Sequence, residues 1–220
     1  GDGWWVAAPG AKFLIPGGLV IGNRNNGCNY GEGVLSVEGG SFGYNCPSGE
    51  GSVTFGHHNT AAGLYSSVTG GNFNTATGPR SSITGGYSNK ATEYYSSVTG
   101  GVGNTAKGGN SSVSGGKNNV AAGIHSSVTG GSDNTAEGDY STVSGGKKNV
   151  AAGENSSISG GSLNSVSGKE ATVSGGSRNQ ASGIMTSVSG GFRNISSGKF
   201  ASVLGGKRKT ASKNFGIFPQ

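Results

Sequence analysis

The sequence is poor in the residues from which most globular domains build a core. Only 31% of its 220 residues are hydrophobic and 12% are charged, and a typical globular domain contains more of both. No apolar run is long enough to span a membrane, and no basic segment followed by an apolar stretch opens the chain as in a signal peptide. We therefore expect no membrane insertion by this segment.

Residues suited to catalysis or metal binding are also scarce. The histidines are His57, His58 and His125, no pair of carboxylates recurs, and the two cysteines form no C-x-x-C motif. No nucleophile elbow appears, and Asp is too rare for a calcium-binding repeat. The sequence therefore predicts no catalytic residue, no metal site and no cofactor, and we expect that the protein is not an enzyme.

Glycine, in contrast, is abundant, with 47 residues. A G-X-Y period is absent, which excludes collagen. Residues 51–215 instead divide into eleven units of 15 residues with no insertion or deletion, and their consensus is S-S-V-S/T-G-G-x-x-N-x-A-x-G-x-x. We number the repeat positions 1 to 15, so that Ser66 is position 1. A strict period of this kind indicates a stacked repeat architecture rather than disorder.

Each unit has room for two short strands and two tight corners. The first strand alternates outward, inward and outward, so the β-branched residue at position 3 is expected inside, together with the small residue at position 11. Glycine at positions 5, 6 and 13 is expected at the corners, where φ is positive or backbones pass closely. The expected inward residues are Val53, Val68, Ile83, Val98, Val113, Val128, Val143, Ile158, Val173, Val188 and Val203 at position 3, and Ala61, Ala76, Ala91, Ala106, Ala121, Ala136, Ala151, Val166, Ala181, Ser196 and Ala211 at position 11.

These observations predict an all-β fold, a single-stranded parallel β-solenoid with 15-residue coils. About 11 regular coils are expected, and at roughly 4.8 Å per coil they make a rod about 50 Å long. Three segments are expected: residues 1–50 as an N-terminal cap or assembly segment with irregular coils, residues 51–215 as the regular solenoid, and residues 216–220 as a C-terminal tail.

Asparagine at position 9 is the most regular polar residue of the repeat. Stacked Asn side chains can hydrogen-bond along a solenoid as a ladder, and this structural role is favoured over a row of ligand-binding amides. The expected ladder consists of Asn59, Asn74, Asn89, Asn104, Asn119, Asn134, Asn149, Asn164, Asn179 and Asn194, and Lys209 ends it.

The N-terminal segment contains the two cysteines. Val20, Val37 and Val53 are 17 and 16 residues apart, which suggests looser coils, and Cys28 and Cys46 follow the first two valines by eight and nine residues. Both thiols would then lie at nearly the same corner of adjacent coils, within disulfide distance. We predict a Cys28–Cys46 disulfide and an oxidising compartment; two free thiols are the alternative.

Aromatic and apolar residues gather at repeat position 15 and at both ends of the chain. Exposed apolar rows often mark interfaces, although a platform for glycan stacking is the alternative. The apolar ends either cap the solenoid or join copies end to end through open strand edges. The candidate assembly residues are Trp4, Trp5, Phe13, Leu14, Tyr65, Tyr95, Tyr140, Phe200, Phe215 and Phe218.

Two outward rows and one charged cluster complete the candidate surfaces. Ser and Thr fill position 2 from Ser67 to Ser157 and position 4 from Thr69 to Ser159, which suits a solvated face, a subunit interface or an ice-binding face. Basic residues suit a polyanion such as an acidic polysaccharide or serve only solubility, and no motif supports nucleic acid. They are Lys147, Lys148, Arg178, Arg193, Lys207, Arg208 and Lys209.

The repeat resembles the YadA-like head of trimeric autotransporter adhesins and related surface or tail-fibre proteins. The resemblance rests on Ser67-Val68-Thr69-Gly70-Gly71 followed by Asn74 and Ala76, and it covers residues 51–215 in register. It implies a left-handed parallel β-roll, usually trimeric, in an adhesive structure at the cell surface. We therefore expect an extracellular, self-associating structural or adhesive module. An ice-binding protein and a receptor-binding segment of a phage tail fibre are the alternatives.

Overall fold

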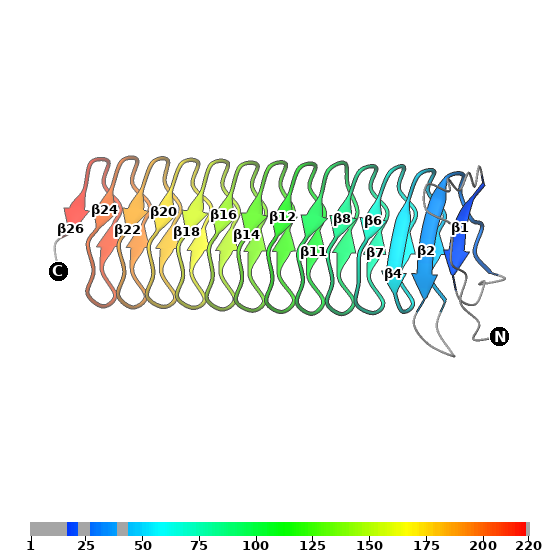
Figure 1. Ribbon diagram of the computed structural model, residues 1–220. Helices are drawn as coiled ribbons and strands as arrows, with labels where there is room; N and C mark the ends of the chain where they lie inside the picture. Colours follow the sequence, from blue (N-terminus) through cyan, green and yellow to red (C-terminus); the bar gives the residue numbers. More distant parts are fainter. Residues whose placement is uncertain (1–16, 22–26, 39–43, 219–220) are drawn as a thin grey trace, which may run out of the picture.

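The computed structural model describes residues 17–21, 27–38 and 44–218. They form a straight rod of stacked coils, with the first strand, β1, and the last strand, β26, at opposite tips (Figure 1). The described residues contain strands and turns but no helix, and therefore no helix that is long and apolar enough to cross a membrane. The predicted all-β parallel solenoid is confirmed.

Two parallel sheets run the length of the rod, one of 14 strands and one of 12. The coils from β2 to β25 each contribute one strand to each sheet, and β1 and β26 add one strand each to the first sheet only. Each strand pairs with its equivalent in the next coil, as Ser67 pairs with Ser82 in β6 and β8. The first sheet consists of β1 (Gly18–Ile21), β2 (Val34–Glu38), β4 (Val53–Gly56), β6 (Ser67–Val68), β8 (Ser82–Ile83), β10 (Ser97–Val98), β12 (Ser112–Val113), β14 (Ser127–Val128), β16 (Thr142–Val143), β18 (Ser157–Ile158), β20 (Thr172–Val173), β22 (Ser187–Val188), β24 (Ser202–Val203) and β26 (Ile217–Phe218). The second consists of β3 (Cys46–Pro47), β5 (Thr60–Ala61), β7 (Thr75–Ala76), β9 (Lys90–Ala91), β11 (Thr105–Ala106), β13 (Val120–Ala121), β15 (Thr135–Ala136), β17 (Val150–Ala151), β19 (Ser165–Val166), β21 (Gln180–Ala181), β23 (Ile195–Ser196) and β25 (Thr210–Ala211).

The core is a thin stack of small side chains between these sheets. From Val68 onward every residue at position 3 is buried, and every residue at position 11 is buried from Ala61 onward. Because Val faces Ala rather than another large side chain, each coil buries little apolar surface on its own. Stability therefore comes mainly from the contact of each coil with its neighbours, as in other solenoids.

The first of the regular coils, which contains β4 and β5, departs from the register that the sequence predicts. Val53 pairs with Ser67 and is half-buried, whereas Thr54 pairs with Val68 and is buried. The inward assignment of Val53 is therefore wrong by one residue, because this coil runs from Ser52 to Tyr65 and is one residue shorter than the others. A shift of one residue moves every side chain of a strand to the opposite face.

The preceding coil shows the same kind of shift. Val37 pairs with Phe55 rather than with Val53, and Ser36 pairs with Thr54. Both Ser36 and Thr54 are buried, and the Thr54 hydroxyl donates a hydrogen bond to Ser36 Oγ over 2.9 Å. The predicted alignment of Val20, Val37 and Val53 is therefore not found. The buried residues of these two coils include Ser36 and Thr54 instead, and their hydroxyl groups are tolerated in the core because they hydrogen-bond to each other.

At the other end, parallel pairing continues beyond Phe215. Ile217 and Phe218 of β26 pair with Ser202 and Val203 of β24. The first sheet thus extends into the segment 216–220 that the sequence suggests is a tail, and Phe218 occupies the register of the buried valines. With nothing stacked on it among the described residues, Phe218 remains 42% exposed.

Glycine is required at position 6 and fits closely at position 13, where Glu93 and Lys213 replace it in two units. Gly71 at position 6 has φ of +80°, and a Cβ atom there would lie 2.2 Å from the carbonyl oxygen of Gly86 in the next coil. Gly78 at position 13 has no positive φ, but its Cβ would lie 2.1 Å from the carbonyl oxygen of Glu93. Position 5 is different, since a Cβ at Gly85 or Gly100 would have no neighbour within 4 Å.

Two further corner positions take the left-handed conformation with ordinary side chains. Position 8 and position 15 have φ between 52° and 58° in every non-glycine case, as in Arg178 and Tyr140. This conformation costs a residue with a Cβ roughly 1–2 kcal/mol. It is held by the preceding coil, because the Arg178 N–H donates to the Ser162 carbonyl (2.9 Å) and the Tyr140 N–H to the Ile124 carbonyl (2.8 Å). The side chains at both corners therefore project from fixed backbone.

Candidate functional site

The asparagines at position 9 form a continuous buried ladder. Each of the ten is at most 1% exposed. In Asn74 the Oδ1 atom accepts the backbone N–H of Asn89 (2.9 Å), and the Nδ2 atom donates to the carbonyls of Gly70 (3.1 Å) and Gly86 (2.9 Å). The same three bonds recur in each coil up to Asn194, whose Oδ1 accepts the N–H of Lys209 (2.9 Å).

This geometry gives the ladder a structural task. Both amide hydrogens are used, one within the coil and one on the next coil, so every Asn ties its own glycine corner to the following one. Buried amides that are fully hydrogen-bonded are stable inside a protein, and they present no free donor to a ligand. The row of amides therefore belongs to the frame of the rod and not to its binding surface.

Sequence reasoning missed the first member of this ladder. Asn45 is 1% exposed; its Oδ1 accepts the N–H of Asn59 (3.0 Å), and its Nδ2 donates to the carbonyls of Val37 (2.9 Å) and Gly56 (3.1 Å). It stands 14 residues before Asn59, one short of the repeat. This spacing, close to one repeat before the first predicted member, is the signal that could have identified it.

The predicted disulfide is present next to this residue. The sulfur atoms of Cys28 and Cys46 are bonded, and the Cα atoms are 5.5 Å apart across a sequence separation of 18. Cys46 lies on β3, the first strand of the second sheet, where it pairs with Thr60. The bridge therefore links two adjacent N-terminal coils next to the first regular one, and Cys46 lies on a strand rather than at a corner.

The outward residues at positions 2 and 4 form one flat face of hydroxyl groups. Position 4 is exposed and position 2 is mostly half-buried. From Ser67 to Ser189 this face holds only Ser and Thr, with no charged residue in nine consecutive coils. Some hydroxyls bond along the axis, as Thr69 does to the Thr84 carbonyl (3.1 Å), and the others face outward at regular spacing.

The candidate assembly residues at position 15 form an exposed but interrupted row. Tyr65, Tyr95, Tyr140, Phe200 and Phe215 are between 38% and 72% exposed. Two pairs stack across adjacent coils, His125 with Tyr140 (ring centroids 5.0 Å apart) and Phe200 with Phe215 (5.1 Å). Between them stand Arg80, Asn110, Asn155 and Glu170, so the row consists of local aromatic clusters and not of one apolar seam.

One of these clusters combines aromatic rings with a cation. The Arg80 guanidinium lies 5.4 Å from the ring centroid of Tyr95 and 5.8 Å from that of Tyr94, and it donates hydrogen bonds to both phenol oxygens. Hydrogen bonding with Tyr94, and then with Arg80, lowers the pKa of Tyr95 below its usual range. The exposed rings at this point of the rod are therefore held in a fixed arrangement.

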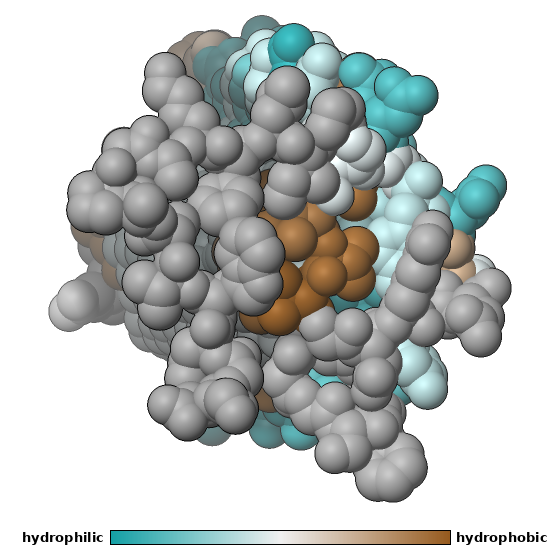
Figure 2. Space-filling model, turned by 45° about the vertical axis from the view of Figure 1, so that its right-hand side comes forward, coloured by the Kyte–Doolittle hydropathy of each residue, from teal (hydrophilic) through white to brown (hydrophobic). Residues whose placement is uncertain are grey.

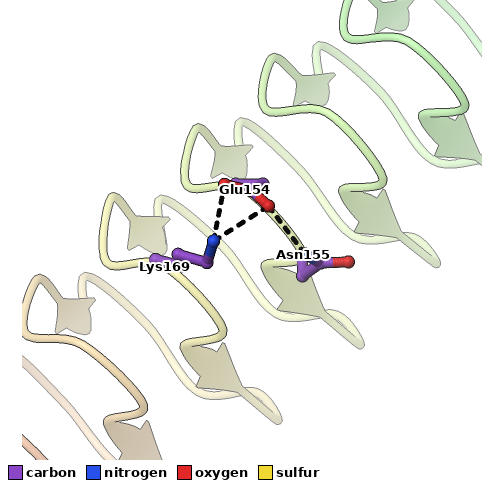
Figure 3. Close-up of polar contacts among 3 residues, drawn as sticks. All are labelled: Glu154, Asn155 and Lys169. Carbon is purple, nitrogen blue, oxygen red and sulfur yellow. Dashed lines mark hydrogen bonds and ion pairs between the residues drawn. The ribbon is translucent and has the colours of Figure 1, made fainter.

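The corner at positions 13 to 15 also carries the only ion pair between described residues. Lys169 Nζ lies 2.9 Å from Glu154 Oε2, both at position 14 of adjacent coils, and both side chains are 49% exposed. Asn155 Nδ2 donates to Glu154 Oε1 over 3.2 Å, so Glu154 links the two neighbours (Figure 3). An exposed pair of this kind contributes at most about 1 kcal/mol.

The basic residues lie at the opposite corner. Positions 7 to 9 carry Lys147, Lys148, Arg178, Arg193, Lys207, Arg208 and Lys209, and all seven are exposed. We call this set the basic corner. Within the described part of the chain, none of its members forms an ion pair, so its charge is not neutralised by the rod itself.

The remaining candidates do not assemble into a reactive site. His57 Nδ1 lies 3.3 Å from Asn72 Oδ1, and the His58 ring stacks on Phe73 with centroids 4.7 Å apart. Among the described residues, no group of three or more His, Cys, Asp or Glu is placed to hold a metal ion. A hollow of about 330 Å³ near the N-terminal coils is lined by Glu32, Gly33, Glu50, Gly51 and Tyr65.

The two tips of the rod are apolar where they are described. At the N-terminal tip, Leu19 and Ile21 of β1 are 39% and 50% exposed, and Figure 2, which brings this tip forward, shows apolar surface on it. At the C-terminal tip, Ile217 is 68% exposed. The candidate residues Trp4, Trp5, Phe13 and Leu14 lie outside the described residues.

No family model matches the chain, and a search of curated proteins finds no match to it.

Proposed function

We propose that this chain is a rigid, non-enzymatic module of an extracellular surface fibre, with a structural and adhesive role. The observation that carries the proposal is the unbroken stack: two parallel sheets of 14 and 12 strands and one asparagine ladder continue from coil to coil. At roughly 4.8 Å per strand, the larger sheet spans about 60 Å. A rod of this kind holds surface groups at fixed intervals.

Fixed intervals suit adhesion to extended or repetitive partners. Side chains at each corner recur once per coil on backbone that is hydrogen-bonded to the next coil. A partner with a regular repeat can then engage several equivalent positions together, and the combined affinity exceeds that of any single contact. The Cys28–Cys46 disulfide supports an extracellular place for this activity, since such bonds persist in oxidising compartments.

The resemblance to YadA-like heads supports a more specific form of this proposal, in which the rod self-associates as a trimer. The exposed aromatic clusters at position 15 and the uncharged hydroxyl face are the surfaces available for lateral packing. The exposed apolar residues at the two tips favour the other form, an end-to-end filament joined through sheet edges.

Sedimentation and electron microscopy of the purified chain test these forms together. A trimer is expected at three times the 21.6 kDa mass of one chain, as a particle about 60 Å long; a filament is expected as particles of variable length with constant width. A persistent compact monomer with no rod shape would remove the proposed fibre role.

The hydroxyl face favours ice binding as a second candidate function. Its particular support is the absence of charge at positions 2 and 4 from Ser67 to Ser189, because a flat uncharged array can order water over many coils. A thermal-hysteresis assay decides it. We expect activity that is lost when Ser127 and Thr129 are both changed to Lys, with Thr135→Lys on the other sheet as the matched control; no hysteresis and no ice shaping by the unmodified protein would exclude this function.

A further inference from the structure

Positive charge is concentrated in the last five regular coils. Residues 141–215 hold 10 Lys and Arg against 2 acidic residues, whereas residues 1–140 hold 6 against 8. The overall charge of +6 is therefore the sum of +8 in one part of the rod and −2 in the remainder. A field of this kind attracts polyanions to one section of the molecule.

Within that section, the charge is also confined to one corner. Seven of the ten cations belong to the basic corner at positions 7 to 9, whereas both acidic residues, Glu154 and Glu170, lie at positions 14 and 15. Glu154 pairs there with Lys169, away from the basic corner (Figure 3). An Asp133 side chain at position 8 marks the N-terminal limit of the basic corner, and it accepts a hydrogen bond from Asn118 (3.3 Å).

The backbone holds these cations in a straight line. Position 7 residues pair in parallel from coil to coil, as in Phe192 and Lys207, and the Arg208 N–H donates to the Phe192 carbonyl (2.9 Å). Lys148, Arg178 and Arg208 occupy position 8 of every second coil, about 10 Å apart at the strand spacing, so they span about 19 Å. Arg193 fills the coil between the last two.

An aromatic ring lies among the cations. The half-buried Phe192 ring has its centroid 5.1 Å from the Arg193 guanidinium carbon, 5.9 Å from that of Arg178 and 5.9 Å from Lys207 Nζ. Cations over a ring are attracted by its negative face, so the ring helps to fix these three side chains. Arginine is also the residue that pairs with planar or multi-oxygen anions through two parallel hydrogen bonds.

From this arrangement we propose that the basic corner binds a linear acidic polysaccharide, one that carries sulfate or carboxylate groups at regular intervals, laid along the axis of the rod. The anionic groups pair with Lys148, Arg178, Arg193 and Arg208, and a sugar ring packs its C–H face on Phe192. The inference rests on the proposed adhesive function and names its ligand class.

The same features disfavour a nucleic acid. Proteins that bind single strands combine a basic groove with several aromatic rings on which successive bases stack. The basic corner is a convex turn of the solenoid with one aromatic residue, and no element projects from it that would enter the groove of a duplex. A polymer of sugars needs only the repeated anion contacts and the single stacking contact.

Binding of the full chain to heparin and to polygalacturonate tests the proposal, with uncharged dextran and single-stranded DNA as comparison ligands. The test variant combines Lys148→Gln, Arg178→Gln, Arg193→Gln and Arg208→Gln. The matched control combines Lys90→Gln, Lys107→Gln, Lys199→Gln and Lys213→Gln, which removes the same charge from other surfaces. At an ionic strength of about 0.15 M, we expect the test variant to bind at least about tenfold more weakly and the control to change by less than about threefold.

Phe192→Leu provides a second variant whose charge is unchanged. It is expected to weaken binding of both polysaccharides several-fold and to leave binding of single-stranded DNA unaltered. Absence of binding to either polysaccharide by the unmodified chain would overturn the proposal, as would equal losses in the test and control variants. If the unmodified chain binds single-stranded DNA more tightly than either polysaccharide, and the variant with four substitutions loses that binding, the basic corner would be reassigned to nucleic acid.

The circular dichroism spectrum and the sedimentation coefficient of each variant separate this proposal from the proposed fibre role. Unchanged rod shape with lost polysaccharide binding supports the basic corner. Unchanged polysaccharide binding by a compact monomer would contradict the fibre while leaving the ligand class in place.

Discussion

At the scale of single residues, buried polar groups decide how this solenoid holds together. The side chain of an asparagine at position 9 makes three hydrogen bonds, two of them to the next coil, as in Asn74. A buried group that loses its partner costs about 1–3 kcal/mol, so one truncated amide affects several groups at once. This explains why the polar position is kept as regularly as the apolar ones.

Asn134→Ala, in the middle of the ladder, is expected to destabilise the protein by roughly 3–5 kcal/mol. It leaves the Gly130 carbonyl and the Asn149 N–H without partners, and it removes one of the two hydrogen bonds that the Gly146 carbonyl accepts, the other coming from the Ser132 N–H. Chemical denaturation followed by circular dichroism measures the change. Asn118→Gly is the control: it alters an exposed Asn at position 8, where Gly103 stands in the preceding coil, and it should change stability by less than about 1 kcal/mol. Equal effects of the two substitutions would contradict the ladder's role.

Serine at position 1 leads to the opposite expectation. The hydroxyls of Ser126 and Ser141 are buried without a hydrogen-bond partner, and Ala171 and Ala201 stand at the same position in other coils. A buried hydroxyl without a partner costs about 1 kcal/mol or more of stability. Ser126→Ala removes this group, so it should stabilise the protein or leave its stability unchanged. Ser96→Ala should destabilise it, since Ser96 Oγ donates to the Glu93 carbonyl (2.7 Å). The difference in denaturation midpoint between the two variants is the measurement.

At the scale of the element, the two glycines of each pair have different tasks. Position 6 combines a positive φ with contact to the next coil, whereas position 5 faces open space. The corner therefore tolerates a side chain on one glycine and not on the other, although the sequence presents the two as equivalent.

Gly131→Ala should destabilise the rod severely. Its φ is +85° and a Cβ would lie 2.1 Å from the Gly146 carbonyl oxygen, so adjacent coils would have to separate. Gly130→Ala adds the same methyl group next to it with no neighbour within 4 Å, and it should change the melting temperature by only a few degrees. Thermal unfolding of the two variants under identical conditions checks the contrast, and a larger loss in Gly130→Ala would be the contrary result.

At the scale of the whole molecule, each coil contacts only its neighbours, so the loss of stability caused by a substitution should remain local. Stability in such a stack is approximately a sum over repeats and their interfaces. The disulfide lies at the junction of the irregular coils with the regular ones, where it closes a loop whose constraint is worth about 3 kcal/mol.

Removal of the disulfide by Cys28→Ser with Cys46→Ser should therefore loosen the N-terminal coils and leave the later ones intact. Amide hydrogen exchange is expected to accelerate in β2 and β3 and to remain unchanged from β10 onward. Proteolysis should correspondingly yield a resistant fragment that contains the regular coils. Faster exchange throughout all coils would show instead that the rod unfolds as one cooperative unit.

The sequence by itself determined the solenoid, because a 15-residue period repeated without interruption requires every coil to be equivalent. It placed valine and alanine inside and asparagine in a hydrogen-bonded ladder, and the spacing of Cys28 and Cys46 was enough to predict their bond. These inferences succeed since each depends only on local alternation or on translation by one coil.

The tertiary structure alone decided what happens where the period breaks and how the corners face. The buried Ser36–Thr54 pair, the half-buried Val53 and the ladder role of Asn45 follow from coils of unequal length, whose register depends on their neighbours in space. The seven basic residues were already apparent as a cluster in the sequence, but their alignment along one edge of the rod follows only when positions 7 to 9 of successive coils are stacked. A period fixes which residues repeat together, but only the closed coil fixes the direction in which each of them points.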